Sequence, residues 1–461
     1  MKKFIKLIVL LVVLAGLVVG YVLYSNYKAE QEKENTDIPQ DTTVNVLSIE
    51  ETSVTSIEYS YDEEKIMLKK KGDKWLWAED EDFPLEQSYP EYMLDDLTNI
   101  VADRLVAENL DNEADFGMDE PNFVINYSTS NGEEYVYTIG DYNSAAKCYY
   151  IKSSVSDKIY MTKKSAVEPF VYYILEMAEV DTIPKFEAEK ITSVSTVKEG
   201  KKQVITTDRT GADFYNKPYD YFYVEDNEIK IPADGVATGE FLNAVEALSL
   251  GEVVEFKPSD SKISECGLSD TSRIVLRVTY DEEVSADESE TSVTVTKSNT
   301  FNIYIGKDIL DDGKDSYYAM FEGSNFLYEL SGGKTLFEKM SVSFMSKLVC
   351  PVSADDTVSV KIELGSEVYF YNIDDIKNSE KLTKVFNSLT GIVHYGKIRK
   401  APSDMKAELA CKVTFDVGDE ELVLEVYKRE GSSNYNAVFD GMLYNNVNEL
   451  SFGDFVKELQ S

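Results

Sequence analysis

The sequence indicates a long unit of strands and helices that occurs three times along the chain, and such a repeat restricts the fold more than any single motif does. The first two copies share a short glycine element, Phe116-Gly117-Met118 in one and Cys266-Gly267-Leu268 in the other. Four apolar segments follow this element in each copy: 123–127, 135–140, 149–151 and 159–161 in the first, and 274–278, 301–306, 317–319 and 327–329 in the second. The third copy is fainter, with segments at 413–415, 422–427, 435–438 and 443–445 and no glycine element.

The spacing of equivalent residues also favours duplication. Leu97 lies as far before Val124 as Leu248 lies before Val275. The interval in the third copy is slightly shorter, as the missing glycine element would require. The alternative is that strand-rich chains resemble one another in composition, and the weakness of the third copy leaves this alternative open.

Each copy is predicted to contain strands, a helix, further strands and a closing helix. The opening strands alternate apolar and polar residues, as at 56–61, 193–197 and 358–362. Helical spacing follows at 92–105, 241–248 and 382–389, and closing helices are expected at 167–177, 336–348 and 452–459. This order predicts an α+β fold made of tandem units of an antiparallel sheet and helices, at 47–185, 186–352 and, in degenerate form, 353–461.

A membrane anchor is predicted ahead of the repeats. Residues 7–27 contain no charged side chain, and a helix needs roughly 20 apolar residues to cross the hydrocarbon of a bilayer. Lys2, Lys3 and Lys6 precede this run. The positive-inside rule therefore places the basic tail 1–6 in the cytoplasm and the bulk of the chain outside, as in a single-pass protein of the cell membrane. The polar segment 28–46 is expected to be a disordered stalk.

A cleaved signal peptide is the alternative for the same run. Its apolar region usually has about 7–15 residues and ends in a cleavage site of small residues. The run here is longer, and Gly20-Tyr21-Val22 and Leu23-Tyr24-Ser25 at its end fit such a site poorly. The uncleaved anchor is therefore favoured, and cleavage stays open.

The charge balance excludes several functions. The chain of 461 residues has 84 acidic and 46 basic side chains, a net charge of −38, and this excess of acidic side chains disfavours sequence-independent binding to nucleic-acid phosphates. His394 is the one histidine, which excludes every metal site built from several histidines. A lone catalytic histidine is also less plausible here than a surface or partly buried one. The acidic stretch 281–291 is expected to be a solvated loop.

Three short motifs resemble catalytic or ligand-binding sequences but do not fit them. Gly332-Gly333-Lys334-Thr335 lacks the first glycine of a phosphate-binding loop, because Tyr328 occupies that position. In the run 308–315, Asp308 and Asp312 fit a calcium loop, but Leu310 and Ala319 occupy positions where it requires carboxylates. A plain Asp-Gly turn is therefore favoured over a loose calcium site, which stays open. Ser259-Asp260-Ser261-Lys262 has the spacing of penicillin-recognising enzymes without their partner motifs. We therefore predict no enzymatic activity, no cofactor, and no catalytic, cofactor-binding or metal-binding residues.

Two residue types are ambiguous. Cys148, Cys266, Cys350 and Cys411 lie far apart, and they could form disulfides outside the cell or be isolated buried thiols. The 31 tyrosines could provide an aromatic binding face for glycan or peptide. Strands also favour tyrosine for packing alone, and this simpler explanation is preferred.

The first two copies resemble a bacterial family, domain-of-unknown-function family 4340. The matching elements are Lys74-Trp75-Leu76, the glycine element with its proline at 116–121, and the strands at 137–140, 149–151 and 159–161. The second copy departs from the pattern, because Thr271 replaces the proline. The resemblance implies an N-terminal anchor but transfers no catalytic residue. Some members are similar to auxiliary proteins of gliding-motility-like ABC transporters, which implies an accessory role at the outer face of a transporter.

The sequence thus predicts a non-catalytic scaffold or accessory protein. Residues 7–27 would hold it in the lipid bilayer, and it would work by contact with envelope or transporter proteins. The alternative is a cell-envelope protein that binds glycan or a small ligand in a groove between repeats. An unrecognised hydrolase would require perturbed carboxylates that converge in one pocket.

Overall fold

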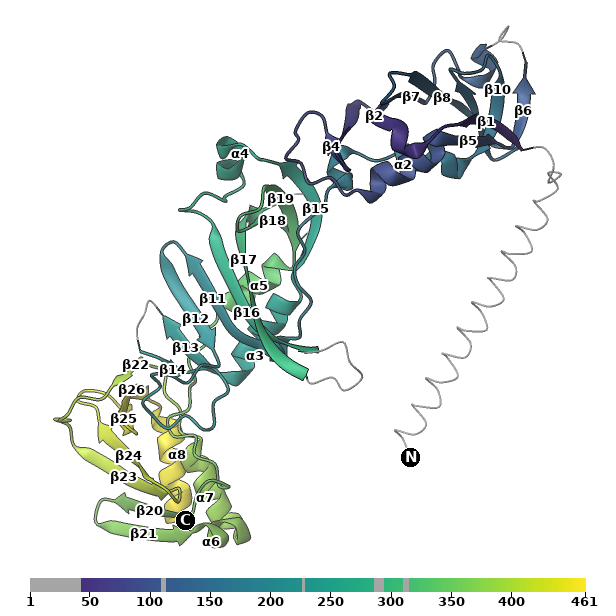
Figure 1. Ribbon diagram of the computed structural model, residues 1–461. Coiled ribbons are helices and arrows are strands. Elements are labelled where there is room, and N and C mark those ends of the chain that lie inside the picture. Colours follow the sequence, from purple (N-terminus) through teal and green to yellow (C-terminus); the bar gives the residue numbers. More distant parts are fainter. Residues whose placement is uncertain (1–42, 109–112, 226–228, 286–293, 310–314) are drawn as a thin grey trace. The chain divides into compact units, whose positions relative to one another are not determined.

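The computed structural model describes residues 43–108, 113–225, 229–285, 294–309 and 315–461 (Figure 1). The chain divides into two compact units, one that ends at Val180 and one over Asp181–Ser461. The predicted tail 1–6, the predicted transmembrane segment 7–27 and most of the predicted stalk 28–46 lie outside the described residues. Within the described ranges, no helix is both long and apolar enough to cross a membrane.

The first unit contains an eight-stranded sheet in the order β4-β3-β2-β7-β8-β9-β10-β6 and a separate two-stranded ribbon, β1-β5. Its strands are β1 Val44–Ser48, β2 Val54–Tyr61, β3 Glu64–Lys71, β4 Lys74–Trp77, β5 Asn99–Ala102, β6 Arg104–Ala107, β7 Phe123–Thr129, β8 Glu134–Asn143, β9 Cys148–Ser153 and β10 Ile159–Lys163; its α-helix is α2 Ser88–Thr98. The stalk prediction is wrong at its end, because residues 44–46 belong to β1, in which Val44 and Asn45 pair with β5.

The second unit contains two large sheets. The second sheet has nine strands in the order β14-β13-β12-β11-β16-β17-β18-β19-β15, and the third has seven in the order β21-β20-β23-β24-β25-β26-β22. The elements of the second are β11 Ile191–Lys198, β12 Lys201–Thr206, β13 Phe222–Glu225, β14 Ile231–Pro232, α3 Gly235–Glu246, β15 Ser249–Phe256, α4 Asp260–Glu265, β16 Ile274–Ser285, β17 Thr294–Asp308, β18 Ser316–Phe321, β19 Phe326–Ser331 and α5 Gly333–Met340. Those of the third are β20 Ser359–Leu364, β21 Glu367–Asn372, α6 Ile373–Asn378, α7 Glu380–Thr390, β22 Ile398–Lys400, β23 Leu409–Asp416, β24 Glu421–Lys428, β25 Tyr435–Phe439, β26 Met442–Val447 and α8 Glu449–Gln460.

The three large sheets follow the same strand order. In each, the opening strands run outward from β2, β11 or β20, and four consecutive strands continue on the other side as β7 to β10, β16 to β19 or β23 to β26. The strand that precedes those four, β6, β15 or β22, closes the far edge. The described pairings are antiparallel, so the predicted α+β class with antiparallel sheets is confirmed.

Two predicted helices in the first unit are wrong in length or type. The helix expected at 92–105 ends at Thr98, because Asn99 leaves the helical region with φ −134° and ψ 71°, and the β-branched Ile100 and Val101 continue as strand β5. The helix expected at 167–177 is replaced by separate 3-10 turns, since Pro169 removes one backbone donor and Tyr173 is extended.

The glycine element of the first two copies is explained by a close backbone approach. A Cβ on Gly140, which lies within β8, the second strand of the four, would lie 2.2 Å from the carbonyl oxygen of Phe116. A Cβ on Gly306, at the same place in the second sheet, would lie 2.1 Å from the carbonyl oxygen of Cys266. The third copy lacks both the element and this glycine. Its equivalent strand, β24, contains no glycine and ends at Lys428. The two features therefore occur or disappear together.

The core of the third sheet shows how alternation and helical spacing combine. In β23, Cys411, Val413 and Phe415 point to one face and are buried, while the residues between them are less so. The helices α7 and α8 bury residues in the same core: Val385, Phe386, Leu389, Phe452, Phe455 and Leu459. Ser379 and Asn448 cap these helices, because their side-chain oxygens accept the backbone N–H groups of Leu382 and Ser451.

A loop of the second sheet completes this core. Tyr215, between β12 and β13, is buried among residues of the third sheet, and its ring meets that of Phe439 edge-on at 6.4 Å. The Tyr215 backbone N–H also donates to the Asp440 carboxylate. These contacts explain why the predicted units 186–352 and 353–461 fall within one compact unit.

The four cysteines are buried free thiols. Burial raises the pKa of Cys148 and of Cys266, and it raises the pKa of Cys411 to about 12. The structure therefore agrees with the second of the two alternatives for these residues, small apolar side chains in the core.

Candidate functional site

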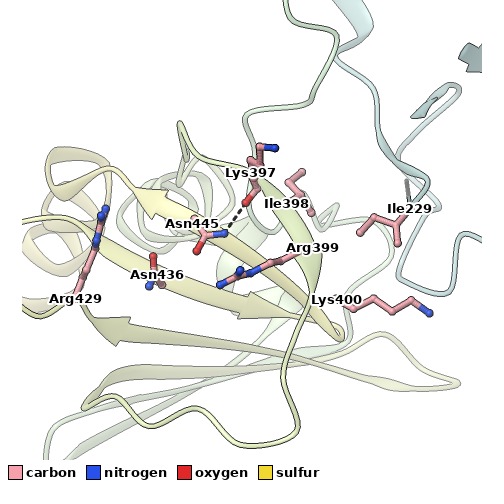
Figure 2. A pocket seen from close by; sticks show the side chains of 8 residues that line it. All are labelled: Ile229, Lys397, Ile398, Arg399, Lys400, Arg429, Asn436 and Asn445. Carbon is pink, nitrogen blue, oxygen red and sulfur yellow. Dashed lines mark hydrogen bonds between the residues drawn. The ribbon is translucent and has the colours of Figure 1, made fainter. Parts of the chain in front are cut away.

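A groove on the third sheet gathers cationic side chains (Figure 2). It has a volume of about 850 Å³ and is lined by Ile229, Lys397, Ile398, Arg399, Lys400, Arg429, Asn436 and Asn445. Lysines and arginines make up half of this lining, in a chain whose net charge is −38. We call it the cationic groove.

The groove is built on the strand β22 at the edge of the sheet. Ile398 is buried in the core, so Arg399 projects from the opposite face of the strand and is exposed. Figure 2 shows the Arg399 side chain extended toward Asn436, while Lys400 points away from it. Because β22 ends its sheet, its second edge has no strand partner in the described part of that sheet.

A close backbone contact fixes the start of this strand. Gly396 donates its N–H to the carbonyl of Asn445 at 3.0 Å, and a Cβ on Gly396 would lie 2.5 Å from that oxygen. Asn446 next to it has φ +58°, a left-handed conformation that asparagine tolerates better than most residues. The glycine and the asparagine thus let the two segments lie against each other.

A series of amide hydrogen bonds positions the floor of the groove. Asn445 Nδ2 donates to the carbonyl of Lys397 at 2.8 Å, as Figure 2 shows. The Asn446 N–H donates to Asn436 Oδ1 at 3.2 Å, and Arg429 Nη1 approaches Asn446 Oδ1 at 3.4 Å. These bonds hold the asparagines while leaving the arginine heads at the surface.

The cations of the groove are only partly neutralised within the protein. Lys400 forms an ion pair with Asp213 at 3.5 Å, and both side chains are mostly exposed, so the pair is weak. Among the described residues, no carboxylate lies within ion-pair distance of Lys397, Arg399 or Arg429. A bound anion would therefore supply the negative charges that these cationic side chains lack within the protein.

The chemistry of the lining suits recognition of an anion. Guanidinium groups present donors in a fork that matches a carboxylate or a phosphate. Amide side chains can bind a peptide backbone or a polar ligand, and the lining contains no thiol, hydroxyl, imidazole or carboxylate. No cluster of three or more His, Cys, Asp or Glu side chains suited to a metal ion occurs in the described ranges.

A second groove lies in the first unit and is rich in tyrosines and carboxylates. It has a volume of about 600 Å³ and is lined by Glu86, Ser88, Tyr89, Tyr92, Asp95, Asp96, Ser165, Glu168, Pro169 and Tyr172. The Tyr89 and Tyr172 rings meet edge-on at 5.0 Å, and Tyr92 is 63% exposed. We call it the tyrosine groove. Aromatic faces beside carboxylates suit a cation or a sugar.

Asp96 in the tyrosine groove makes the first unit sensitive to pH. Burial, with help from the Asp95 charge, raises the pKa of Asp96 to about 6. The Asp96 carboxyl thus keeps its proton to a higher pH in the folded chain than in the unfolded chain. Its contribution to the stability of the fold is therefore fully present below about pH 4 and is lost as the pH rises through about 6.

We expect Asp96→Asn to stabilise the first unit at pH 7 by on the order of 1 kcal/mol, a value reduced for solvent screening. Both tryptophans of the chain, Trp75 and Trp77, lie in β4, so tryptophan fluorescence during urea unfolding reports on the first unit alone. The gain should vanish near pH 4. A gain of equal size at both pH values would contradict the assignment to Asp96.

The residues weighed from sequence as catalytic or ligand-binding have structural roles. His394 is fully buried rather than at the surface; its Nε2 lies 3.0 Å from the carbonyl oxygen of Ser346, and burial lowers its pKa. Ser259 caps helix α4 by accepting the Lys262 N–H at 3.2 Å, which accounts for their spacing. Gly332, with φ +87°, precedes helix α5, and residues 310–314 of the weighed calcium loop lie outside the described residues.

The cationic groove was not predicted from the sequence. The available signal is the run Lys397-Ile398-Arg399-Lys400, which is basic in a strongly acidic chain. Arg429, Asn436 and Asn445 join it only through the strand order of the third sheet.

Comparison with known proteins gives a match to a family model. A family described as a domain of unknown function (DUF4340) matches residues 75–271, from strand β4 to just beyond the second glycine element. No curated protein and no solved structure matches the chain.

Proposed function

We propose that the protein, whose residues 75–271 match the family of domains of unknown function DUF4340, is a non-catalytic scaffold that binds an acidic segment of a partner protein. Residues 7–27 would anchor it in the cell membrane, with the sheets on the extracytoplasmic side. The single observation behind the binding function is the cationic groove in a chain of net charge −38.

The repeated strand order supports a scaffold. Three sheets of one topology are what duplication of a single unit would produce, and we propose that they are tandem repeats. Repeats of this kind provide extended surfaces for contact. The resemblance to transporter auxiliary proteins suggests envelope or ABC-type transporter proteins as the partners.

The charge distribution favours a peptide over larger anions. A nucleic acid or an anionic lipid surface would extend beyond the groove and meet the acidic remainder of the chain. A short acidic segment can stay within the groove, where the Arg399 and Arg429 guanidinium groups can pair with its carboxylates and Asn436 can bind its backbone.

A binding titration tests this proposal. The full chain in detergent micelles is titrated with a fluorescent peptide of eight glutamates. We expect saturable binding that weakens as salt increases, and no binding of a peptide of eight lysines to this groove. Arg399→Glu with Arg429→Glu should weaken binding of the glutamate peptide by about 100-fold, because two positive side chains that attract the peptide become negative side chains that repel it.

A charge-matched variant controls for the change in net charge. Lys381→Glu with Lys384→Glu alters the exposed side of helix α7 by the same number of charges and should leave the affinity within about twofold. Equal loss in both variants, or no loss in either, would refute the groove as the binding site.

The tyrosine groove supports a second candidate function, binding of an envelope glycan or a small ligand. Tyr89, Tyr92 and Tyr172 offer ring faces on which a sugar can stack, and Asp96 offers a polar anchor. A neutral oligosaccharide that binds the full chain, with no binding of the glutamate peptide, would favour this second function over the first.

A further inference from the structure

We propose that strand β21 pairs with β21 of a second copy of this chain and joins two third sheets into one. The inference is independent of the cationic groove. It rests on what the first two sheets contain at the corresponding edge and on which side chains β21 exposes.

The third sheet lacks a strand that the other two possess. In the first sheet, β3 is covered by β4, with Leu68 opposite Trp77. In the second, β12 is covered by β13, with Ile205 opposite Tyr223. In the third, the corresponding strand β21 ends the sheet. One edge of β21 is therefore without a strand partner in the described part of the chain.

The side chains of β21 are unusual for an unprotected edge. Val368 is 62% exposed and Phe370 is 61% exposed on its outer face, while Tyr369 and Tyr371 pack against the core on the other. Soluble proteins usually protect such edges with charges, proline or a bulge. Here Glu367 is the one charged residue of the strand.

The strands that cover this edge elsewhere indicate the chemistry of the occupant. Strand β4 reads Lys-Trp-Leu-Trp and β13 reads Phe-Tyr-Val-Glu, so both are short and aromatic. Strand β21 reads Glu-Val-Tyr-Phe-Tyr-Asn and is of the same type. A second copy of β21 is thus a suitable covering strand, and the chain itself supplies it.

The sequence of β21 is self-complementary in one antiparallel register. When the two strands are centred on Tyr369, Val368 of each lies opposite Phe370 of the other on the outer face. Glu367 then lies opposite Tyr371, so no like charges face each other. The two-fold axis pairs the free β21 edge of one copy with the free β21 edge of the other. This contact therefore gives a closed dimer and not a filament.

The oligomeric state of the full chain in detergent micelles, measured by sedimentation velocity, tests the proposal. We expect a monomer–dimer equilibrium that strengthens as salt screens the repulsion between two chains of net charge −38, opposite to the salt dependence of peptide binding in the groove. Phe370→Lys should weaken the dimer by about 100-fold with an unchanged unfolding midpoint. Leu450→Lys, at another exposed apolar residue, should leave it intact.

Cysteine pairs test the register. Val368→Cys with Phe370→Cys should give an intermolecular disulfide under mild oxidation, and each single variant should give none, because each new cysteine would face a native side chain. A monomer at every concentration and salt, a dimer that Phe370→Lys does not weaken, or cross-linking by the single variants would overturn the proposal.

Discussion

Replacing Gly140 by alanine is expected to destabilise the first unit by about 3 kcal/mol, since overpacking of this severity forces the backbone to move. The added Cβ would lie 2.2 Å from the carbonyl oxygen of Phe116 and 3.0 Å from the Met118 side chain. Because these atoms belong to the glycine element, relief of the clash would displace the segment that leads into β7. Tryptophan fluorescence during urea unfolding measures the loss in the first unit.

Two further substitutions separate crowding from other effects. Gly72→Ala places a Cβ with nothing within 4 Å at φ +65°, and it should cost only about 1 kcal/mol for the left-handed backbone. Gly306→Ala repeats the clash in the second sheet, at 2.1 Å from Cys266, and should leave the tryptophan transition unchanged. Equal losses for Gly140→Ala and Gly72→Ala would contradict the close-approach explanation.

Tyr215→Ala is expected to separate the second and third sheets into independently unfolding parts and to cost about 3 kcal/mol, as for removal of a buried aromatic ring. Tyr215 is 6% exposed and lies in the core of the third sheet although its loop belongs to the second. Differential scanning calorimetry of the full chain should then resolve one more transition than in the unmodified protein.

Tyr215→Phe is the matched control. It keeps the ring against Phe439 and removes only the hydroxyl, whose bond to Asp356 is long at 3.4 Å. The expected loss is at most about 1 kcal/mol, without a new transition. An unchanged number of transitions for Tyr215→Ala would show that other contacts couple the two sheets.

Much of the fold could be predicted from local patterns. The alternation in 193–197 and 358–362 predicts strands because one face of each sheet is buried. The first segment lies in β11, and the second lies in β20 from Ser359 onward. The helix at 92–105 was too long because its apolar spacing continues into Ile100 and Val101, whose β-branched side chains suit a strand as well. Local patterns do not decide between the two where apolar residues continue.

The candidate site could not be predicted in the same way. Arg399 and Arg429 are distant in sequence, and they line one groove only because β22 follows β26 at the edge of the sheet. The absence of a strand beyond β21 was visible only after the three strand orders could be compared. Both features depend on which strands are neighbours, which residue periodicity does not encode.

The location of the full chain in the cell tests the central claim most directly, namely that an anchored repeat scaffold works outside the membrane. Cells expressing the full chain are fractionated, and protease is added to intact spheroplasts before the fragments are identified. The account predicts that the protein sediments with membranes, that protease removes residues beyond 46, and that deletion of residues 7–27 releases the chain from the membrane fraction. Full-length, protease-protected protein in the cytosolic fraction would contradict it.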